Sequence, residues 1–191
     1  MERIETTDQE FINENFDEVS LSGQDFEECT FINCQFNNAT LNDVNFTDTV
    51  FDGCNFSMTA FKNTGLRKVQ FSNTKILGIH FEDCNPFLLE MAFTNCNISL
   101  SSFCNLNLKS ICFDECRLIE SDFSSANLSK AIFRQTNLDR SVFFNTILEH
   151  ADLSTAVNYS IDPIRNKLKG LKVSFPSLLG LLEGHGLDVI L

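Results

Sequence analysis

Between Phe11 and Leu153, an apolar residue recurs at every fifth position. The count runs from Phe11 to Phe81 and again from Leu88 to Leu153, and its 29 apolar centres hold 17 of the 20 phenylalanines. A period of five fits neither an α-helix, with about 3.6 residues per turn, nor a strand that alternates every second residue. It predicts short extended segments joined by turns.

A second class of small or β-branched residues stands two positions before most centres, as Cys34, Ala39 and Val44 do, and the positions between are mostly polar. Two residues in five therefore point inward, and four repeats close a square coil of 20 residues. Stacked coils would hydrogen-bond like parallel strands, about 4.8 Å apart, which satisfies the backbone polar groups. The period therefore predicts an all-β solenoid with a filled interior.

Several repeats carry a recognisable motif: ADLST at 151–155, ANLSK at 126–130, TNLDR at 136–140 and SDFSS at 121–125. They resemble the A(D/N)LXX unit of pentapeptide repeat proteins, and the resemblance covers about 150 of the 191 residues. It implies a right-handed quadrilateral β-helix. We expect this β-helix over 11–156, an N-terminal cap or tail over 1–10, and a capping and dimerisation module over 157–191.

The repeat is interrupted once, because the step from Phe81 to Leu88 is seven residues. The added residues lie in the run Cys84, Asn85, Pro86, Phe87, whose proline cannot donate to a β-ladder. The run predicts a bulge or a small protruding turn. Such a turn is either structurally neutral or, as the projecting loops of some family members imply, a contact with a target.

The segment after Leu153 departs from the repeat. Asp162 and Pro163 are typical of a helix start, and Gly170 could end that helix. A second helix is expected from Ser174 or Pro176 to Gly184 or Gly186, followed by a short strand. The family resemblance implies dimerisation through this module, and a monomeric cap is the alternative. The candidate interface residues are all apolar: Phe175, Leu178, Leu179, Leu181, Leu182, Leu187, Val189 and Ile190.

Five of the eight cysteines occupy the inward small position, where a thiol acts as a compact hydrophobe: Cys29, Cys34, Cys54, Cys96 and Cys116. If the interruption preserves the count, the last four share one interior column with Thr74 and Thr136. No CxxC pair or nearby histidine supports zinc, so we expect no metal and no cofactor.

Localisation follows from similar arguments. Reduced thiols fit the cytoplasm. The charged start lacks a signal-peptide core, and no apolar stretch approaches the roughly 18 residues of a membrane span. We expect a soluble cytoplasmic protein.

Catalysis finds little support in the residues. His80, His150 and His185 are far apart in the count, and phosphate-binding loops and HExxH motifs are absent. Cys104 and Cys112 should point outward, but neither has a histidine in its column. We expect a protein that is not an enzyme.

Charge is the feature most suggestive of function. Twelve acids and no Lys or Arg lie between residues 4 and 61, in a chain with a net charge of −12. Because stacked coils lie about 4.8 Å apart, these acids give the rod a charge density along its axis comparable to that of duplex DNA, which has about one charge per 1.7 Å. Such a surface repels nucleic acid and attracts proteins that bind it. The candidate surface residues are Asp17, Glu18, Asp25, Glu27, Glu28, Asp43, Asp48 and Asp52.

The Qnr-type quinolone-resistance and microcin-immunity members of the family resemble DNA and act on DNA gyrase or topoisomerase IV. The resemblance implies that this chain is a DNA mimic that binds a type II topoisomerase and protects it from quinolones or peptide toxins. Two features depart from those members, since no long loop projects and cations interrupt the later shaft. A generic interaction scaffold with another protein partner, whose acids serve solubility, is the alternative. No direct binding to nucleic acid or membrane is expected.

Overall fold

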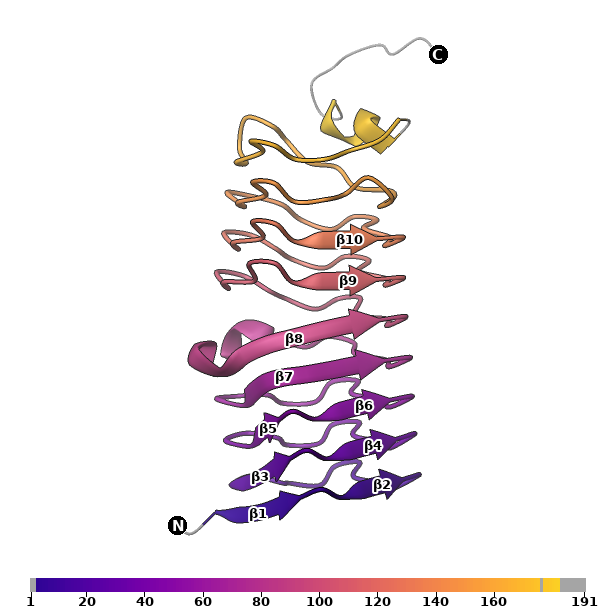
Figure 1. Cartoon of the computed structure of the whole chain (residues 1–191), viewed down its shortest axis with the longest axis vertical. Helices are drawn as coiled ribbons and strands as arrows, with labels where there is room; N and C mark the ends of the chain where they lie inside the picture. The colour runs from indigo at the N-terminus through magenta and orange to yellow at the C-terminus, as the bar shows by residue number, and fades with distance from the viewer. Residues whose placement is uncertain (1–2, 176, 183–191) are drawn as a thin grey trace.

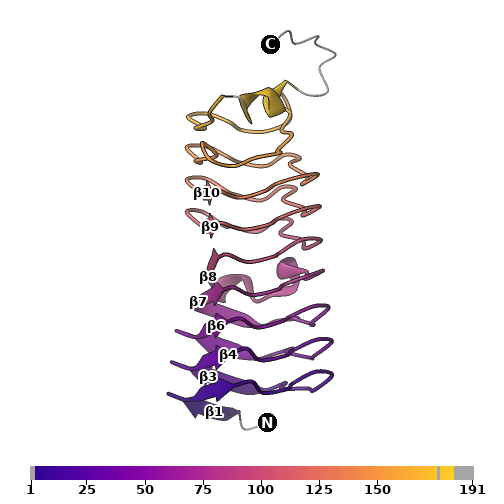
Figure 2. The ribbon, with the colours of Figure 1, turned by 90° about the vertical axis from the view of Figure 1, so that its right-hand side faces the viewer.

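A computed structural model describes residues 3–175 and 177–182 of the chain. They wind into a parallel β-solenoid whose coils stack along one rod, with the two ends of the chain at opposite ends of the rod (Figure 1). Figure 2 shows the same regular stacking from the side. The all-β solenoid predicted from the five-residue period is therefore confirmed.

In the described residues, ten short parallel strands form one sheet that covers two adjoining sides of the rod: β1 (Ile4–Thr7), β2 (Glu10–Ile12), β3 (Gln24–Glu27), β4 (Thr30–Ile32), β5 (Asn45–Thr47), β6 (Val50–Asp52), β7 (Gly65–Ser72), β8 (Leu89–Thr94), β9 (Cys112–Asp114) and β10 (Ile132–Arg134). The described residues also form three 3₁₀ helices: η1 (Phe81–Asp83) and η2 (Pro86–Leu88) between β7 and β8, and η3 (Ser177–Leu181) after the last strand. None of the helices in the part of the chain that the structure describes has the length and apolar character needed to span a bilayer.

The pairing register reproduces the 20-residue coil. Phe26 pairs with Phe46 and Phe31 with Phe51, each 20 residues on. The four sides of the rod are named here by their centres in the first coils. Face A holds Phe26 and Phe46, face B holds Phe31 and Phe51, face C holds Phe36 and Phe56, and face D holds Leu41 and Phe61.

A turn follows each extended segment because the residue two positions after most centres adopts a left-handed backbone. Asn33, Asn38 and Asn73 have φ of 53°, 53° and 52°. Asparagine tolerates this region better than most residues with a side chain. The polar residues between centres thus have a structural role as well as a solvent-facing one.

Phenylalanine rings fill the interior. Phe93, Phe113 and Phe133 stack with centroid separations of 5.3 and 5.2 Å, and Phe103 stacks on Phe123 at 5.0 Å. The two columns meet edge to face, with Phe103 and Phe113 5.8 Å apart. These rings occupy the interior of the shaft, in agreement with the filled interior that the period predicts.

Small inward residues link each coil to the one before it. The Thr74 hydroxyl donates to the Phe51 carbonyl at 3.2 Å, and the Thr136 hydroxyl donates to the Phe113 carbonyl at 3.0 Å. The Cys54 and Cys96 thiols make the equivalent contacts with the Phe31 and Phe71 carbonyls. The predicted column of thiols and threonines is present because Lys75 pairs with Asn97, which preserves the face count across the interruption.

The solenoid begins earlier than the sequence indicated. Residues 4–7 form β1, which pairs in register with β3, so Thr6 lies opposite Phe26. Residues 4–10 therefore belong to the first coil. The apolar count did not reach them because threonine stands where a centre is expected.

The solenoid also continues beyond residue 156. Lys167 pairs with Ile147, and Lys172 pairs with Asp152, both at the 20-residue spacing. The helix predicted from Asp162 to Gly170 is wrong, since Asp162 accepts a hydrogen bond from the Ile164 amide in a turn and the coil then resumes. A proline after aspartate suits such a turn as well as a helix start.

The second predicted helix is present in part as η3, which is short and lies over the last coil. The Gly180 carbonyl accepts a hydrogen bond from the Ile161 amide at 2.9 Å, and a side chain at Gly180 would meet the Tyr159 carbonyl. The ends predicted at Gly184 or Gly186 and the final strand, with Leu187, Val189 and Ile190, lie outside the described residues.

Candidate protein-binding surface

The eight acids predicted as a binding surface encircle the first three coils. Asp25 and Glu27 lie on β3 in face A, and Asp52 lies on β6 in face B. Asp17, the first residue after Phe16, lies on face C beneath Asn37, whose amide donates to its carboxylate at 2.8 Å. The remaining acids occupy turn positions: Glu18, Glu28, Asp43 and Asp48. The structure therefore arranges them as a belt rather than as one patch.

Five of these acids already have partners within the shaft. Arg3 contacts Asp25 through Nε at 2.6 Å, and Asn45 donates to the same carboxylate at 2.9 Å. Asp48 pairs with Lys68 at 3.3 Å. Asn37, Asn63 and Asn73 hydrogen-bond to the carboxylates of the acids one coil earlier: Asp17, Asp43 and Asp52.

Glu18, Glu27 and Glu28 are exposed and make no ion pair with another described residue. Two of them, Glu27 and Glu28, follow Phe26 directly and lie at the junction of faces A and B. Arg3 is the one cation among residues 3–61, and Asp25 holds it. The contact between Arg3 and Asp25 was not predicted from the sequence. The coil length of 20 residues was the available signal, because residues 22 positions apart lie close together on neighbouring coils.

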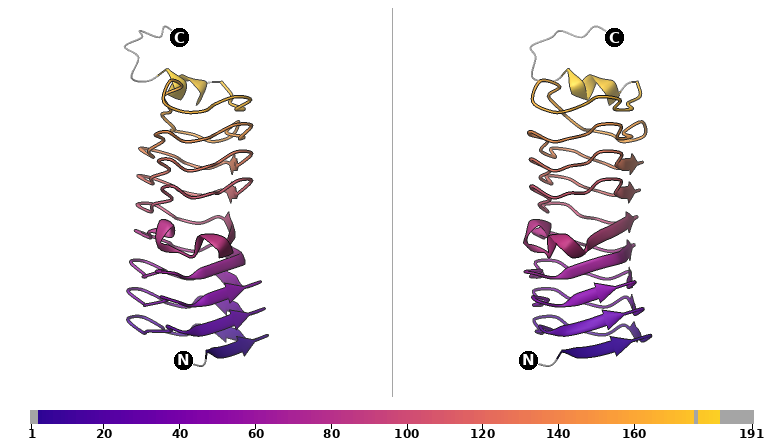
Figure 3. Two further views of the ribbon diagram at one scale, coloured as in Figure 1. Left: turned by 90° about the vertical axis from the view of Figure 1, so that its left-hand side faces the viewer. Right: turned by 60° about the vertical axis from the view of Figure 1, so that its left-hand side comes forward.

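The interruption produces a projection on one side of the rod between β7 and β8 (Figure 3). The Asn85 side chain caps η2 by accepting a hydrogen bond from the Phe87 amide at 3.1 Å. Phe87 is 93% exposed, the highest value among the exposed large hydrophobic residues. The prediction of a protruding turn needs one correction, since Cys84 is buried beneath it.

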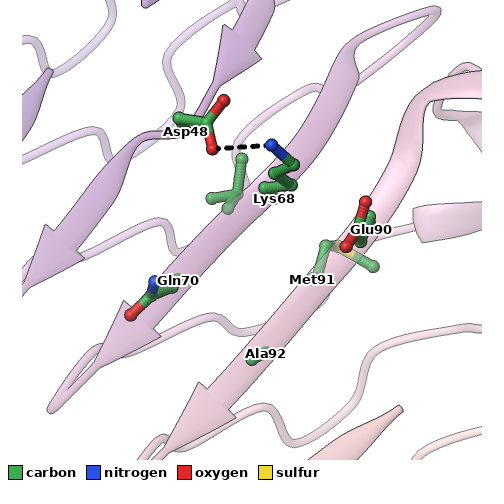
Figure 4. Close-up of a pocket in the computed structure, with 7 residues that line it drawn as sticks. Asp48, Lys68, Gln70, Glu90, Met91 and Ala92 are labelled. Carbon is green, nitrogen blue, oxygen red and sulfur yellow. Dashed lines mark ion pairs between the residues drawn. The ribbon is translucent and has the colours of Figure 1, made fainter. Parts of the chain in front are cut away.

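The register shifts next to this projection. Leu66 pairs with Leu89 rather than with Leu88, and Val69 pairs with Met91, so between these two pairs β7 has one more residue than β8. A hollow opens there, lined by Lys68, Glu90 and Met91 among others, with Lys68 turned toward Asp48 (Figure 4). Leu88 instead packs over Gly65, where a side chain would come within 3.0 Å of its Cδ1 atom.

The C-terminal candidate interface is divided. Phe175 is 70% exposed, whereas Leu178, Leu179 and Leu182 are partly buried and Leu181 packs against the core. The packing of Leu181 gives this segment a capping role. Dimerisation through it stays a prediction.

The structure places potential reactive groups apart from one another. His80 contacts Glu82 at 3.0 Å on the surface of face D, and among the described residues no group of three or more His, Cys, Asp or Glu side chains could hold a metal ion. Cys104 and Cys112 are half-buried, and the other six thiols are buried.

Thiol reactivity should follow this burial. Desolvation raises the pKa of Cys54 to about 12, and it also raises the pKa of Cys104 and Cys112. We expect iodoacetamide at pH 8 to modify only Cys104 and Cys112 in the folded protein, more slowly than free cysteine, because the thiolate is the nucleophile. Mass spectrometry before and after urea unfolding measures this, and rapid native labelling of Cys54 would contradict the packed interior.

The geometry defines a class of protein: a solid parallel β-solenoid whose surface, rather than an internal pocket, is available for partners. Sequence profiles described as "Pentapeptide repeat region" and "Pentapeptide repeats (8 copies)" match residues 24–86 and 121–157, together about half of the chain. The chain belongs to the pentapeptide repeat proteins. No curated protein matches it.

Solved structures share the fold. HetL, a pentapeptide repeat protein involved in heterocyst differentiation regulation in the cyanobacterium Nostoc sp. strain PCC 7120, is 14% identical with a TM-score of 0.76, over 90% of this chain and 86% of HetL. A trypsin-treated form of QnrB1, a plasmid-mediated fluoroquinolone resistance protein, is 24% identical with a TM-score of 0.65, over 97% and 90% of the two chains. Full-length QnrB1 is 18% identical with a TM-score of 0.53, over 96% and 100%. At these identities, the similarity shows the fold alone.

Proposed function

We propose that this protein is a non-catalytic DNA mimic whose acidic N-terminal coils bind a type II topoisomerase, DNA gyrase or topoisomerase IV, and thereby protect it from quinolones or peptide toxins. The proposal places the protein in the cytoplasm. The observation that carries it is the acidic belt of the first three coils, in which Glu18, Glu27 and Glu28 have no cationic partner among the described residues.

The shape of the belt supports this function. Negative side chains project from faces A, B and C and from the turns on both sides of face D, so an enzyme groove that closes around DNA would meet negative charge around most of the rod. Complementary charge speeds association and fixes orientation more than it adds affinity. The similarity to QnrB1 is consistent with this reading, because that protein is a fluoroquinolone resistance protein.

A scaffold or regulator with an unrelated protein partner is the second candidate. One observation favours it: the exposed Phe87 ring is a contact that duplex DNA does not offer. HetL, with the same fold, is involved in regulating differentiation.

The first experiment adds the purified protein to gyrase supercoiling and quinolone-induced cleavage assays. We expect reduced quinolone-dependent cleavage at micromolar protein. No change in either assay, with gyrase or with topoisomerase IV, would reject the DNA-mimic function and leave the scaffold or regulator as the remaining candidate.

Charge is tested by a pair of matched variants. Replacing Glu18 and Glu27 by glutamine should weaken the effect on gyrase by about tenfold, since unpaired charges on a contact surface steer association. Replacing Glu115 and Glu149, two acids of the later coils, by glutamine removes the same charge outside the belt and should change little. Equal losses in the two variants would show that only net charge matters.

A further inference from the structure

Charges are segregated along the corner between faces A and B. One side chain from each coil stands there, two positions after the face A centre in seven coils and beside Lys68 in β8, where the register shifts, and we call this column the charged corner. From the N-terminal end, it contains Asp8, Glu28, Asp48, Lys68, Glu90, Ser110, Lys130 and His150. Its first three residues are acidic, Lys68 and Glu90 stand at its middle with opposite signs, and Lys130 is a cation near its C-terminal end.

Most of these charges have no counter-ion among the residues that the structure describes. Asp48 and Lys68 form the one ion pair of the column among the described residues, at 3.3 Å, and both are partly exposed. Glu28, Glu90 and Lys130 are exposed and make no such pair. When this column is turned upside down about its middle, Lys68 faces Glu90 and Glu28 faces Lys130, so the edge is complementary to its own copy.

We propose that two copies of this chain associate side by side and antiparallel through face A and the charged corner. The two-fold axis crosses the rods between the coils of Lys68 and Glu90. A closed two-fold interface places the same surface on both subunits, so every contact occurs twice. The proposal goes beyond topoisomerase binding and does not depend on it.

The register of this pairing follows from the 20-residue coil. Lys68 meets Glu90 of the partner subunit, Glu28 meets Lys130 of the partner subunit, and Asp8 meets His150 of the partner subunit. The column of side chains one residue before the charged corner contains Glu27 and Arg67. In the same register it brings no like charges together, because Glu27 meets Ser129 of the partner subunit and Arg67 meets Leu89 of the partner subunit. Shifting the partner subunit by one coil along the rod brings like charges together. For example, a two-fold axis at Glu90 places Glu90 against Glu90 of the partner subunit.

An apolar contact accompanies the charges. Phe87 projects from η2 in the coil next to the proposed axis and is 93% exposed. Exposed ion pairs are each worth only about 0.2–1 kcal/mol, so they give register rather than strong affinity. A large aromatic side chain near the centre of an interface is the kind of anchor that supplies affinity.

Sedimentation velocity of the full chain, 21.6 kDa as a monomer, gives the first measurement. We expect a dimer at about 20 mM salt that dissociates toward monomer at about 500 mM salt, because screening weakens exposed pairs. A monomer at every salt concentration would overturn the proposal.

A charge swap provides the specific test. Glu28→Lys and Lys130→Glu should each weaken dimerisation by about tenfold, and the double variant should restore it, because the pair is re-formed with reversed signs. Within one chain the two residues are five coils apart, about 24 Å, well beyond the roughly 10 Å over which salt screens charges. Restoration can therefore come only from contact between subunits.

Matched controls sit on the opposite side of the rod. Glu18→Lys and Arg117→Glu make the same charge changes on and beside face C and should leave the dimer intact. A double variant that stays monomeric would refute the pairing. So would a dimer that survives both single changes but is lost when Leu178 and Leu179 are replaced by serine, which would assign the interface to the C-terminal segment.

Discussion

Replacing Phe31 by alanine is expected to lower the free energy of unfolding by about 3–5 kcal/mol, the range for a large aromatic removed from a packed core. Phe31 is fully buried, stacks on Phe11 at 4.6 Å and on Phe51 at 4.9 Å, and meets other rings edge to face. The cavity cannot collapse easily, because the neighbouring rings are held by backbone pairing above and below. Urea denaturation followed by circular dichroism measures the loss.

The control for this prediction is another phenylalanine. Phe87→Ala removes the same atoms from a ring that is 93% exposed, and it should change the free energy of unfolding by less than about 0.5 kcal/mol. Similar losses at the two positions would contradict the assignment of Phe31 to the interior and of Phe87 to the surface.

The second large effect is expected at Asn166, which holds the last complete coil together. Its side chain accepts a hydrogen bond from the Thr146 amide at 2.8 Å and donates to the carbonyls of Phe143 and Asp162 at 3.0 and 2.9 Å. Asn166→Ala would remove these hydrogen bonds and leave the buried Thr146 amide and Phe143 carbonyl without the Asn166 side chain as their partner. We expect a loss of about 3 kcal/mol, since each buried unsatisfied group costs about 1–3 kcal/mol and some will gain water.

Asn107→Ala is the matched control, because its side chain makes an exposed amide contact with Asn127 at 3.1 Å. It should cost less than about 0.5 kcal/mol. Hydrogen exchange locates the effect as well: Asn166→Ala should speed exchange of the Thr146 and Lys167 amides while leaving the first coils protected. Uniform acceleration along the rod would contradict the local role given to Asn166.

The sequence predicts the shaft well because one period controls each interior contact. The same five-residue count that places Phe113 under Phe133 also places Cys96 under Cys116, and both columns are present. Such prediction works because each repeat meets only the coil before and the coil after it.

The ends of the shaft were harder to predict because other local signals compete with the period there. Leu168 and Val173 stand 20 residues after Leu148 and Leu153, so the count resumes, but the run around Tyr159 and Pro163 hides it. Thr6 breaks the apolar pattern in the same way at the start. At Thr6, backbone pairing with Phe26 rather than an apolar centre keeps the coil.

The candidate surface could be predicted only in part, since a charge count does not reveal which charges are neutralised. Asp25 and Asp48 belong to the acidic stretch in the sequence, but each has a cationic partner in the fold. Glu18 and Glu27 do not, which is why they are the sharper choices for substitution. The exposure of Phe87 could not be predicted from the sequence either, because it depends on the path that the backbone takes through the interruption.

Self-association and topoisomerase binding would use overlapping residues. The proposed dimer covers Glu28 and leaves Glu18, on the far side of the rod, exposed. We therefore expect the protein to act on gyrase more strongly at dilutions that favour the monomer, and Lys130→Glu, which weakens the dimer, should not weaken gyrase binding.

Competition between this protein and duplex DNA for gyrase tests the central claim most directly. Fluorescently labelled DNA is bound to gyrase at low salt, and unlabelled protein is added while anisotropy is followed. A DNA mimic predicts displacement of the DNA, weakened by added salt and by the Glu18 and Glu27 substitutions but not by those at Glu115 and Glu149. Binding of the protein to gyrase with the DNA still in place would contradict it.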